Sequence, residues 1–346
     1  MTTTPPLGFI DGGVPPAGLD SKALVDIYRW MVRLRAFDER AVALQRQGRL
    51  GTYPMFWGEE ATQAGPLYAC RDEDWVFPSY RQGAIGILRG LSPATIFKYR
   101  RGFGGDHGFW NPRSLRVGPS IVSIGTHLSH ATGLAYAAKI RGDHACSLVW
   151  FGDGATSEGD FHEALNIASV WKAPVVFFCV NNRWAISTPV ERQTATPTIA
   201  EKAVAYGMPA VRVDGFDPFA CWKAAHDALE SARSGSGPTL LEAVCYRLAA
   251  HGTADDPGKY RDESVTQKWR ELEPVARSAA FLKRLGALDD STEEQIRSEA
   301  GALVARAVNE SELITETPPE ILFDTVYSSG RPGSFAEGLE ELRSVL

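Results

Sequence analysis

Two short, continuously apolar segments in the middle of the chain constrain its fold more than any other feature: residues 145–151 (ACSLVWF) and 175–180 (VVFFCV). Apolar runs of this length are typical of strands in a parallel sheet whose two faces are both covered. Between them, Phe161 and Leu165 recur at helical spacing, and Pro174 ends the helical pattern. Strands that alternate with helices predict an α/β fold, in which helices flank a mostly parallel sheet.

The rest of the chain extends this alternation. Residues 210–213 and 240–246 predict two further strands, with a helix over 218–234 between them. Extra helices are predicted over 264–312, where Ser291 has the spacing of a helix-capping residue. We expect three parts: a flexible leader over 1–21, an α/β domain with a C-terminal helical part over 22–330, and a C-terminal tail over 331–346.

The composition excludes several classes of protein. The chain has 346 residues and a formal charge of −6, which argues against a protein that binds nucleic acid as its main function. No apolar run approaches the roughly 18 residues of a membrane span, so we expect no membrane partner. The five cysteines are odd in number and form no CxxC pair. The start of the chain lacks the features of a signal or transit peptide, so a reduced, cytoplasmic protein is expected.

Small and polar residues follow each of the two central strands. Gly152-Asp153-Gly154 comes after the first strand, and Asn182 comes at the end of the second. A right-handed βαβ crossover brings these strand ends to the same edge of the sheet. A carboxylate and an amide oxygen are suitable ligands for Mg²⁺. Glycines allow close approach of a phosphate, and a helix predicted from Ser157 would point free N–H groups at it. The unit therefore predicts a magnesium–diphosphate site.

Other phosphate-binding motifs fit less well. No GxxxxGK[ST] motif occurs, which excludes a P-loop. A dinucleotide fingerprint needs a third glycine, where this chain has Ser157, and an acid after the second strand, where it has Asn. A nicotinamide-dependent dehydrogenase thus stays a less favoured alternative. A non-catalytic assembly subunit that kept the fold and lost the cofactor is another.

The span from Asp153 to Asn182 matches the GDG…NN signature of thiamine diphosphate enzymes. Further matching segments are residues 53–61, 77–81, 152–166 (GDGATSEGDFHEALN), 181–189 (NNRWAISTP), 206–215 (YGMPAVRVDG) and 251–261 (HGTADDPGKYR). Over roughly residues 22–330, the chain resembles the alpha subunit of the thiamine diphosphate-dependent first component of 2-oxo acid dehydrogenase complexes. It looks more like the branched-chain and bacterial members than the animal pyruvate enzymes.

The resemblance implies thiamine diphosphate and Mg²⁺ as cofactors. The implied metal ligands are the side chains of Asp153 and Asn182 and the main-chain carbonyl of Trp184. His251, on a Gly/Asp/Pro-rich loop, would contact the diphosphate and help to bind the 2-oxo acid or transfer a proton. The implied cofactor-binding residues are Tyr80, Arg81, Ile124, Gly152, Asp153, Gly154, Ala155, Asn182, Trp184, Ile186 and His251.

The resemblance also implies an activity and partners. With a beta subunit, as an α₂β₂ heterotetramer, the chain would decarboxylate a 2-oxo acid oxidatively. The acyl group would then pass to lipoyl on a dihydrolipoyl acyltransferase. A branched-chain 2-oxo acid is favoured; the alternatives are pyruvate dehydrogenase and, less favoured, acetoin dehydrogenase. The resemblance implies that the carboxylate that activates the cofactor comes from the beta subunit. In this chain Glu59 and Glu60 are candidates by residue type alone.

Several residues also have ordinary structural interpretations. Phe56 and Trp57 either line a substrate tunnel or belong to the core. Asn181 is expected to brace the turn rather than to bind metal. His127 and His130 have a spacing seen in metal sites, but no third ligand accompanies them. We therefore expect His127 to have a packing role.

Overall fold

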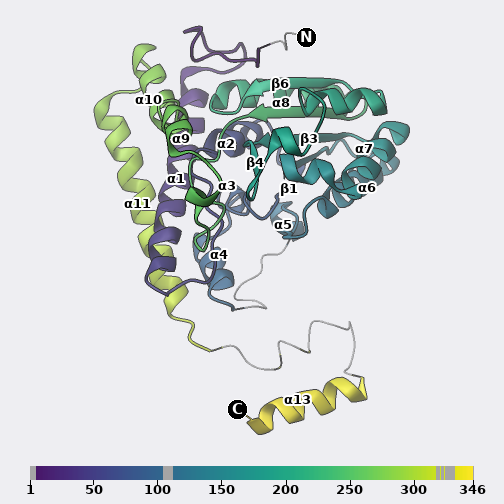
Figure 1. Cartoon of the computed structure of the whole chain (residues 1–346), viewed down its shortest axis with the longest axis vertical. Helices are drawn as coiled ribbons and strands as arrows, with labels where there is room; N and C mark the ends of the chain where they lie inside the picture. Colours follow the sequence, from purple (N-terminus) through teal and green to yellow (C-terminus); the bar gives the residue numbers. More distant parts are fainter. Residues whose placement is uncertain (1–4, 104–111, 317–319, 321–322, 324–331, 346) are drawn as a thin grey trace.

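A five-stranded, wholly parallel sheet forms the centre of the protein (Figure 1). The computed structural model describes residues 5–103, 112–316, 320, 323 and 332–345. The strand order is β1-β2-β3-β7-β6. The strands are β1 (Trp75–Phe77), β2 (Ser147–Gly152), β3 (Val175–Asn181), β6 (Ala210–Asp214) and β7 (Thr239–Val244). The predicted α/β fold is therefore confirmed, and the helix α7 joins β2 to β3 as a crossover between neighbouring parallel strands.

Helices cover both faces of the sheet, and further helices extend the domain on one side (Figure 1). The longer helices are α1 (Ser21–Arg46), α2 (Glu60–Tyr68), α4 (Pro93–Arg100), α6 (Thr126–Arg141), α7 (Gly159–Trp171), α8 (Pro218–Arg233), α9 (Glu263–Arg270), α10 (Pro274–Arg284), α11 (Asp290–Glu312) and α13 (Gly333–Val345). Short helical turns are α3 (Ile85–Leu88), α5 (Pro112–Leu115), η2 (Asp153–Ser157), η3 (Val190–Arg192), η4 (Ala200–Tyr206) and η5 (Pro257–Lys259). A two-stranded antiparallel hairpin, β4 (Trp184–Ala185) with β5 (Thr188–Pro189), follows β3.

The side chains of β2 explain why its sequence is apolar without alternation. Leu148 and Trp150 point into a core shared with α8, whereas Val149 and Phe151 point into a second core shared with α6 and α7. All four side chains are fully buried, because successive residues of a strand face opposite sides of the sheet. Burial on both faces fixes the position of the strand ends where the chemically important residues follow.

The structure differs from the sequence expectations at three places. Trp75–Phe77 forms edge strand β1, which is not among the predicted strands, because three residues are too few for a recognisable pattern. The helix after β2 begins at Gly159 rather than Ser157, since the η2 turn and an extended Glu158 come first. The cap of α11 is Asp289, whose side chain accepts the Thr292 N–H at 2.7 Å, so the expected start at Ser291 was wrong.

Part of the expected leader is held against the sheet. Leu7 pairs in parallel with Val213 of β6, and the N–H groups of Phe9 and Ile10 donate to the Asp217 carboxylate at 2.6 and 2.9 Å. These contacts tie residues 7–10 to the domain, whereas the leader was expected to be flexible. The boundaries at residues 22 and 330 remain predictions. Among the residues that the structure describes, none of the helices combines the length and the apolar character needed to cross a membrane.

Candidate active site

A cavity of about 660 Å³ lies at the carboxyl edge of the sheet and brings together the two predicted strand ends. Asp153 directly follows β2, and Asn182 directly follows β3. The two strands are hydrogen-bonded neighbours, with Gly152 opposite Val180. Both Asp153 and Asn182 line this cavity, which is the location that ligands occupy in open α/β sheets. The structure therefore brings Asp153 and Asn182 to one cavity, as the sequence predicted.

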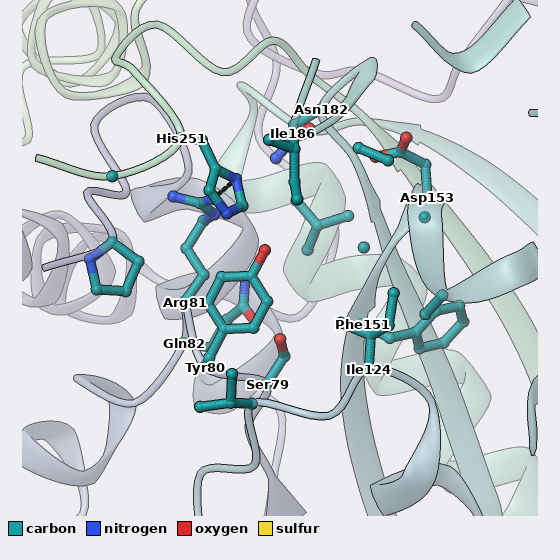
Figure 2. Close-up of a pocket in the computed structure, with 18 of the residues that line it drawn as sticks. Ser79, Tyr80, Arg81, Gln82, Ile124, Phe151, Asp153, Asn182, Ile186 and His251 are labelled. Carbon is teal, nitrogen blue, oxygen red and sulfur yellow. Dashed lines mark hydrogen bonds between the residues drawn. The ribbon is translucent and has the colours of Figure 1, made fainter. Parts of the chain in front are cut away.

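The other residues expected around the cofactor meet in the same cavity. Figure 2 shows Tyr80, Arg81 and His251 on one side of it, with Asp153 and Ile124 on the other. All the predicted cofactor-binding residues line the cavity: Tyr80, Arg81, Ile124, Gly152, Asp153, Gly154, Ala155, Asn182, Trp184, Ile186 and His251. These residues come from five separate stretches of the chain, so only the fold brings them together.

Asp153 is a buried carboxylate with no cationic partner. Its side chain is almost inaccessible, and Oδ2 accepts a hydrogen bond from Gln193 Nε2 at 2.6 Å. Burial raises the pKa of Asp153 to about 6, although the Gln193 hydrogen bond opposes that effect. No ion pair to Asp153 occurs within the described ranges. A buried carboxylate in this state gains stability from a bound cation, which fits the expected metal site.

Asn182 is held by two neighbours. Its Nδ2 donates to Glu59 Oε1 at 2.7 Å, and its Oδ1 accepts the Trp184 N–H at 3.2 Å. The carbonyl of Trp184 accepts a hydrogen bond from Arg247 Nη1 at 3.1 Å. A carbonyl oxygen has two lone pairs, so this bond leaves Trp184 one position for a metal. The carboxylate of Asp153, the amide oxygen of Asn182 and the carbonyl oxygen of Trp184 are thus hard oxygen donors of the kind that suits Mg²⁺.

The described residues contain no group of three or more His, Cys, Asp or Glu side chains that could hold a metal. Asn181 braces the turn, as expected, because its Nδ2 donates to Glu242 at 2.8 Å and its Oδ1 accepts the Arg183 N–H. His127 donates from Nε2 to the Trp150 carbonyl at 2.6 Å, and it also lines the cavity, so its packing role stays a prediction.

Arg81 and His251 form a polar pair opposite Asp153. Arg81 Nη2 lies 3.2 Å from His251 Nδ1, and Figure 2 marks this contact by a dashed line. Because arginine only donates, Nδ1 accepts, and the ring proton is assigned to Nε2. Burial lowers the pKa of His251 to about 4, with Arg81 and Arg247 as further causes. The histidine is therefore neutral near pH 7 and can donate from Nε2.

Local hydrogen bonds hold the loop that carries His251. Asp255 accepts the His251 N–H at 2.8 Å and also binds the Tyr260 hydroxyl. Arg261 donates to the carbonyls of Arg247, Leu248 and Ala249. These contacts fix the loop backbone at the rim of the cavity.

The two adjacent glutamates have different surroundings. Glu59 lines the cavity, and its carboxylate is engaged by Asn182. Glu60 points away, with its carboxylate bound to Arg35 Nε at 2.6 Å and to the Gly58 N–H at 3.0 Å. Glu60 is therefore a structural ion-pair residue.

The two predicted substrate residues lie outside the cavity lining. Phe56 is buried in a core with residues of α1 and α4. Trp57 packs against the guanidinium groups of Arg35 and Arg270, which lie 5.8 and 5.4 Å from its ring centre. A role in a substrate tunnel remains a prediction for both residues. On the same stretch of chain, Thr52 and Pro54 line the cavity instead.

Sequence reasoning missed Gln193 and Arg247, and it did not predict the contact of Glu59 with Asn182. Gln193 binds Asp153, Glu59 binds Asn182, and Arg247 binds the carbonyls of Trp184 and Ile186. No spacing rule in the sequence points to Gln193 or Arg247.

Comparison with known proteins agrees with this geometry. The model of the dehydrogenase E1 component family matches residues 28–320. The 3-methyl-2-oxobutanoate dehydrogenase subunit alpha of Mycobacterium tuberculosis is 41% identical over 328 residues, which cover 95% of this chain and 89% of the relative. The pyruvate dehydrogenase E1 component subunit alpha of Staphylococcus aureus is 36% identical over 323 residues, which cover 93% and 86%. The chain therefore belongs to the dehydrogenase E1 component family.

Proposed function

We propose that the cavity binds the diphosphate end of thiamine diphosphate together with Mg²⁺. Members of the family use this cofactor. The main support is that a buried, cation-free carboxylate, Asp153, shares one cavity with the amide of Asn182 and the guanidinium of Arg81. Asp153, Asn182 and the Trp184 carbonyl would hold the metal, and Arg81 would bind the phosphate oxygens as a fixed positive charge.

When bound, thiamine diphosphate supplies the carbanion and the electron sink for decarboxylation of a 2-oxo acid. The residues of this chain bind and orient. The backbone at Gly154 and Ala155 borders the cavity, where its N–H groups would meet the diphosphate. His251, neutral and protonated at Nε2, would hydrogen-bond the substrate or move a proton at that atom.

We further propose an oxidative 2-oxo acid dehydrogenase in which this chain is the alpha subunit. A beta subunit would complete an α₂β₂ heterotetramer, and a lipoylated dihydrolipoyl acyltransferase would take the acyl group. Both relatives are named as alpha subunits, which supports a beta partner. The five free cysteines support a reduced, cytoplasmic setting.

A branched-chain 2-oxo acid is the proposed substrate, since the more similar of the two relatives is named for 3-methyl-2-oxobutanoate. Pyruvate is the second candidate because of the name of the other relative. Turnover of each acid by the chain reconstituted with its beta subunit, measured with a dye acceptor, decides between them. A preference for pyruvate would overturn the branched-chain assignment and leave the family assignment intact.

Calorimetry with thiamine diphosphate tests the cofactor site itself. The full chain with its beta partner should bind the cofactor tightly in the presence of Mg²⁺ and weakly without it. Asp153→Ala should abolish the Mg²⁺-dependent part and leave the fold unchanged by circular dichroism. Asp143→Ala, at an exposed loop position, is the matched control and should bind normally. Normal Mg²⁺-dependent binding by Asp153→Ala would refute the assignment.

A further inference from the structure

Glu59 is an acidic side chain that lines the cavity and contacts one proposed metal ligand, Asn182. It immediately precedes helix α2 and is completely buried. Its Oε1 accepts from Asn182 Nδ2 at 2.7 Å, and its Oε2 accepts from Gln82 Nε2 at 3.4 Å. Arg81 Nε lies 3.8 Å from Oε1. The carboxylate therefore joins the proposed metal ligand Asn182 to the proposed phosphate ligand Arg81.

The hydrogen bond to Glu59 decides which way the Asn182 amide faces. An asparagine amide can present either its oxygen or its nitrogen to a given side, but a metal can be bound only by the oxygen. If the amide were flipped, Oδ1 would face the Glu59 carboxylate, and two acceptors would lie about 2.7 Å apart. A buried contact between two acceptors is unfavourable. The hydrogen bond to Glu59 Oε1 therefore holds Nδ2 toward Glu59 and leaves Oδ1 on the other side of the amide.

A second contact favours the same orientation of the Asn182 amide. Asn182 Oδ1 accepts the Trp184 N–H at 3.2 Å, so the oxygen lies beside the residue whose carbonyl is the third proposed metal ligand. Glu59 cannot turn away, because its other partners are also buried: Arg81 and Gln82 have 5% and 2% of their surface exposed. The orientation of the amide is thus set before any metal binds.

We propose that Glu59 is a positioning residue, which holds the Asn182 amide so that its oxygen faces the cation site. This inference rests on the proposed magnesium–diphosphate site. It gives Glu59 a task different from proton transfer, for which both of its oxygens are already engaged by hydrogen bonds. Glu59 acts on the metal only through Asn182.

Exchanging the acid at position 59 with the amide at position 182 tests whether Glu59 orients Asn182. Glu59→Gln weakens the acceptor that orients Asn182, and Asn182→Asp places two carboxylates against each other. Each single variant should raise the Mg²⁺ concentration for half-maximal thiamine diphosphate binding by at least about tenfold, as is usual when a residue behind a metal ligand is changed. In the double variant, the new amide at position 59 can donate to the new carboxylate at position 182, which then offers its second oxygen to the metal. Binding should return to within about threefold of the wild type.

Calorimetry of the full chain with its beta partner, titrated with thiamine diphosphate and separately with inorganic pyrophosphate, measures these effects without using activity. Glu60→Gln is the matched control, because Glu60 is equally buried but binds Arg35 instead of Asn182. It should leave the Mg²⁺ dependence unchanged. If Glu59→Gln alone does not fold, Asn182→Asp is compared with the double variant, where the same recovery is expected.

Two results would overturn the proposal: wild-type Mg²⁺ dependence in Glu59→Gln, or a double variant that binds no better than the weaker single variant. A purely structural role for Glu59 would produce the second result, since loss of packing is not restored by changing Asn182. Failure of the underlying function would look different. In that case the wild type itself would show no Mg²⁺-dependent binding.

Discussion

Replacement of Arg81 by glutamine should raise the pKa of His251. In the wild type this pKa is lowered to about 4, first by burial and then by the charge of Arg81, whose Nη2 lies 3.2 Å from Nδ1. Glutamine retains a donor group but removes the positive charge. A protonated His251 would then no longer face a cation at this position, and protonation becomes easier.

The size of the effect follows from the geometry. With charge centres roughly 5 Å apart and an effective dielectric constant of about 20, the repulsion between the two cations is about 3 kcal/mol. This energy corresponds to about 2 pKa units. The pKa of His251 is lowered from 6.5 to about 4 in all, and burial is the largest cause, so Arg81 contributes less than this limit. We therefore expect Arg81→Gln to raise the pKa of His251 by about 1 unit.

Nitrogen-15 NMR of the histidine rings measures this change directly. His251→Asn identifies the His251 signals among the seven histidines. In the wild type above pH 5, Nδ1 should be unprotonated and Nε2 protonated. Arg49→Gln is the control, since Arg49 pairs with Glu312 on the surface and should leave His251 unaffected. An unchanged His251 pKa in Arg81→Gln would mean that burial alone keeps the ring neutral, and a lowered pKa would contradict the electrostatic reasoning.

Three further predictions concern stability. Gly65→Ala should lower the free energy of unfolding by about 1–3 kcal/mol or more, seen as a lower melting temperature, because the new Cβ would lie 2.2 Å from the Pro218 carbonyl oxygen. Asp217→Ala should cost about 1–3 kcal/mol in urea unfolding, since its carboxylate caps α8 and accepts the Phe9 N–H. Burial raises the pKa of Asp38 to about 7, so the native state binds an extra proton between about pH 4 and 7. The wild type should lose stability relative to Asp38→Asn as the pH rises through that window, and parallel pH profiles would contradict this.

The sequence alone determined the framework of the site. The apolar runs before Asp153 and Asn182 required buried parallel strands, and the handedness of the crossover placed both residues at one edge of the sheet. Tyr80, Arg81 and His251 were predicted through the resemblance rather than by spacing. The structure places them in the same cavity, although His251 is 170 residues from Arg81.

Only the tertiary structure decided which side chains hold these residues in place. Glu59 forms a hydrogen bond with Asn182, which lies 123 residues later in the sequence. Gln193, which follows the β4–β5 hairpin, forms a hydrogen bond with Asp153. Packing places Phe56 and Trp57 outside the lining of this cavity, and their role in a substrate tunnel stays a prediction. Strand periodicity is a local property that the sequence displays directly. The partner of a buried polar group depends on how distant segments dock, and its pKa depends on the water that they exclude.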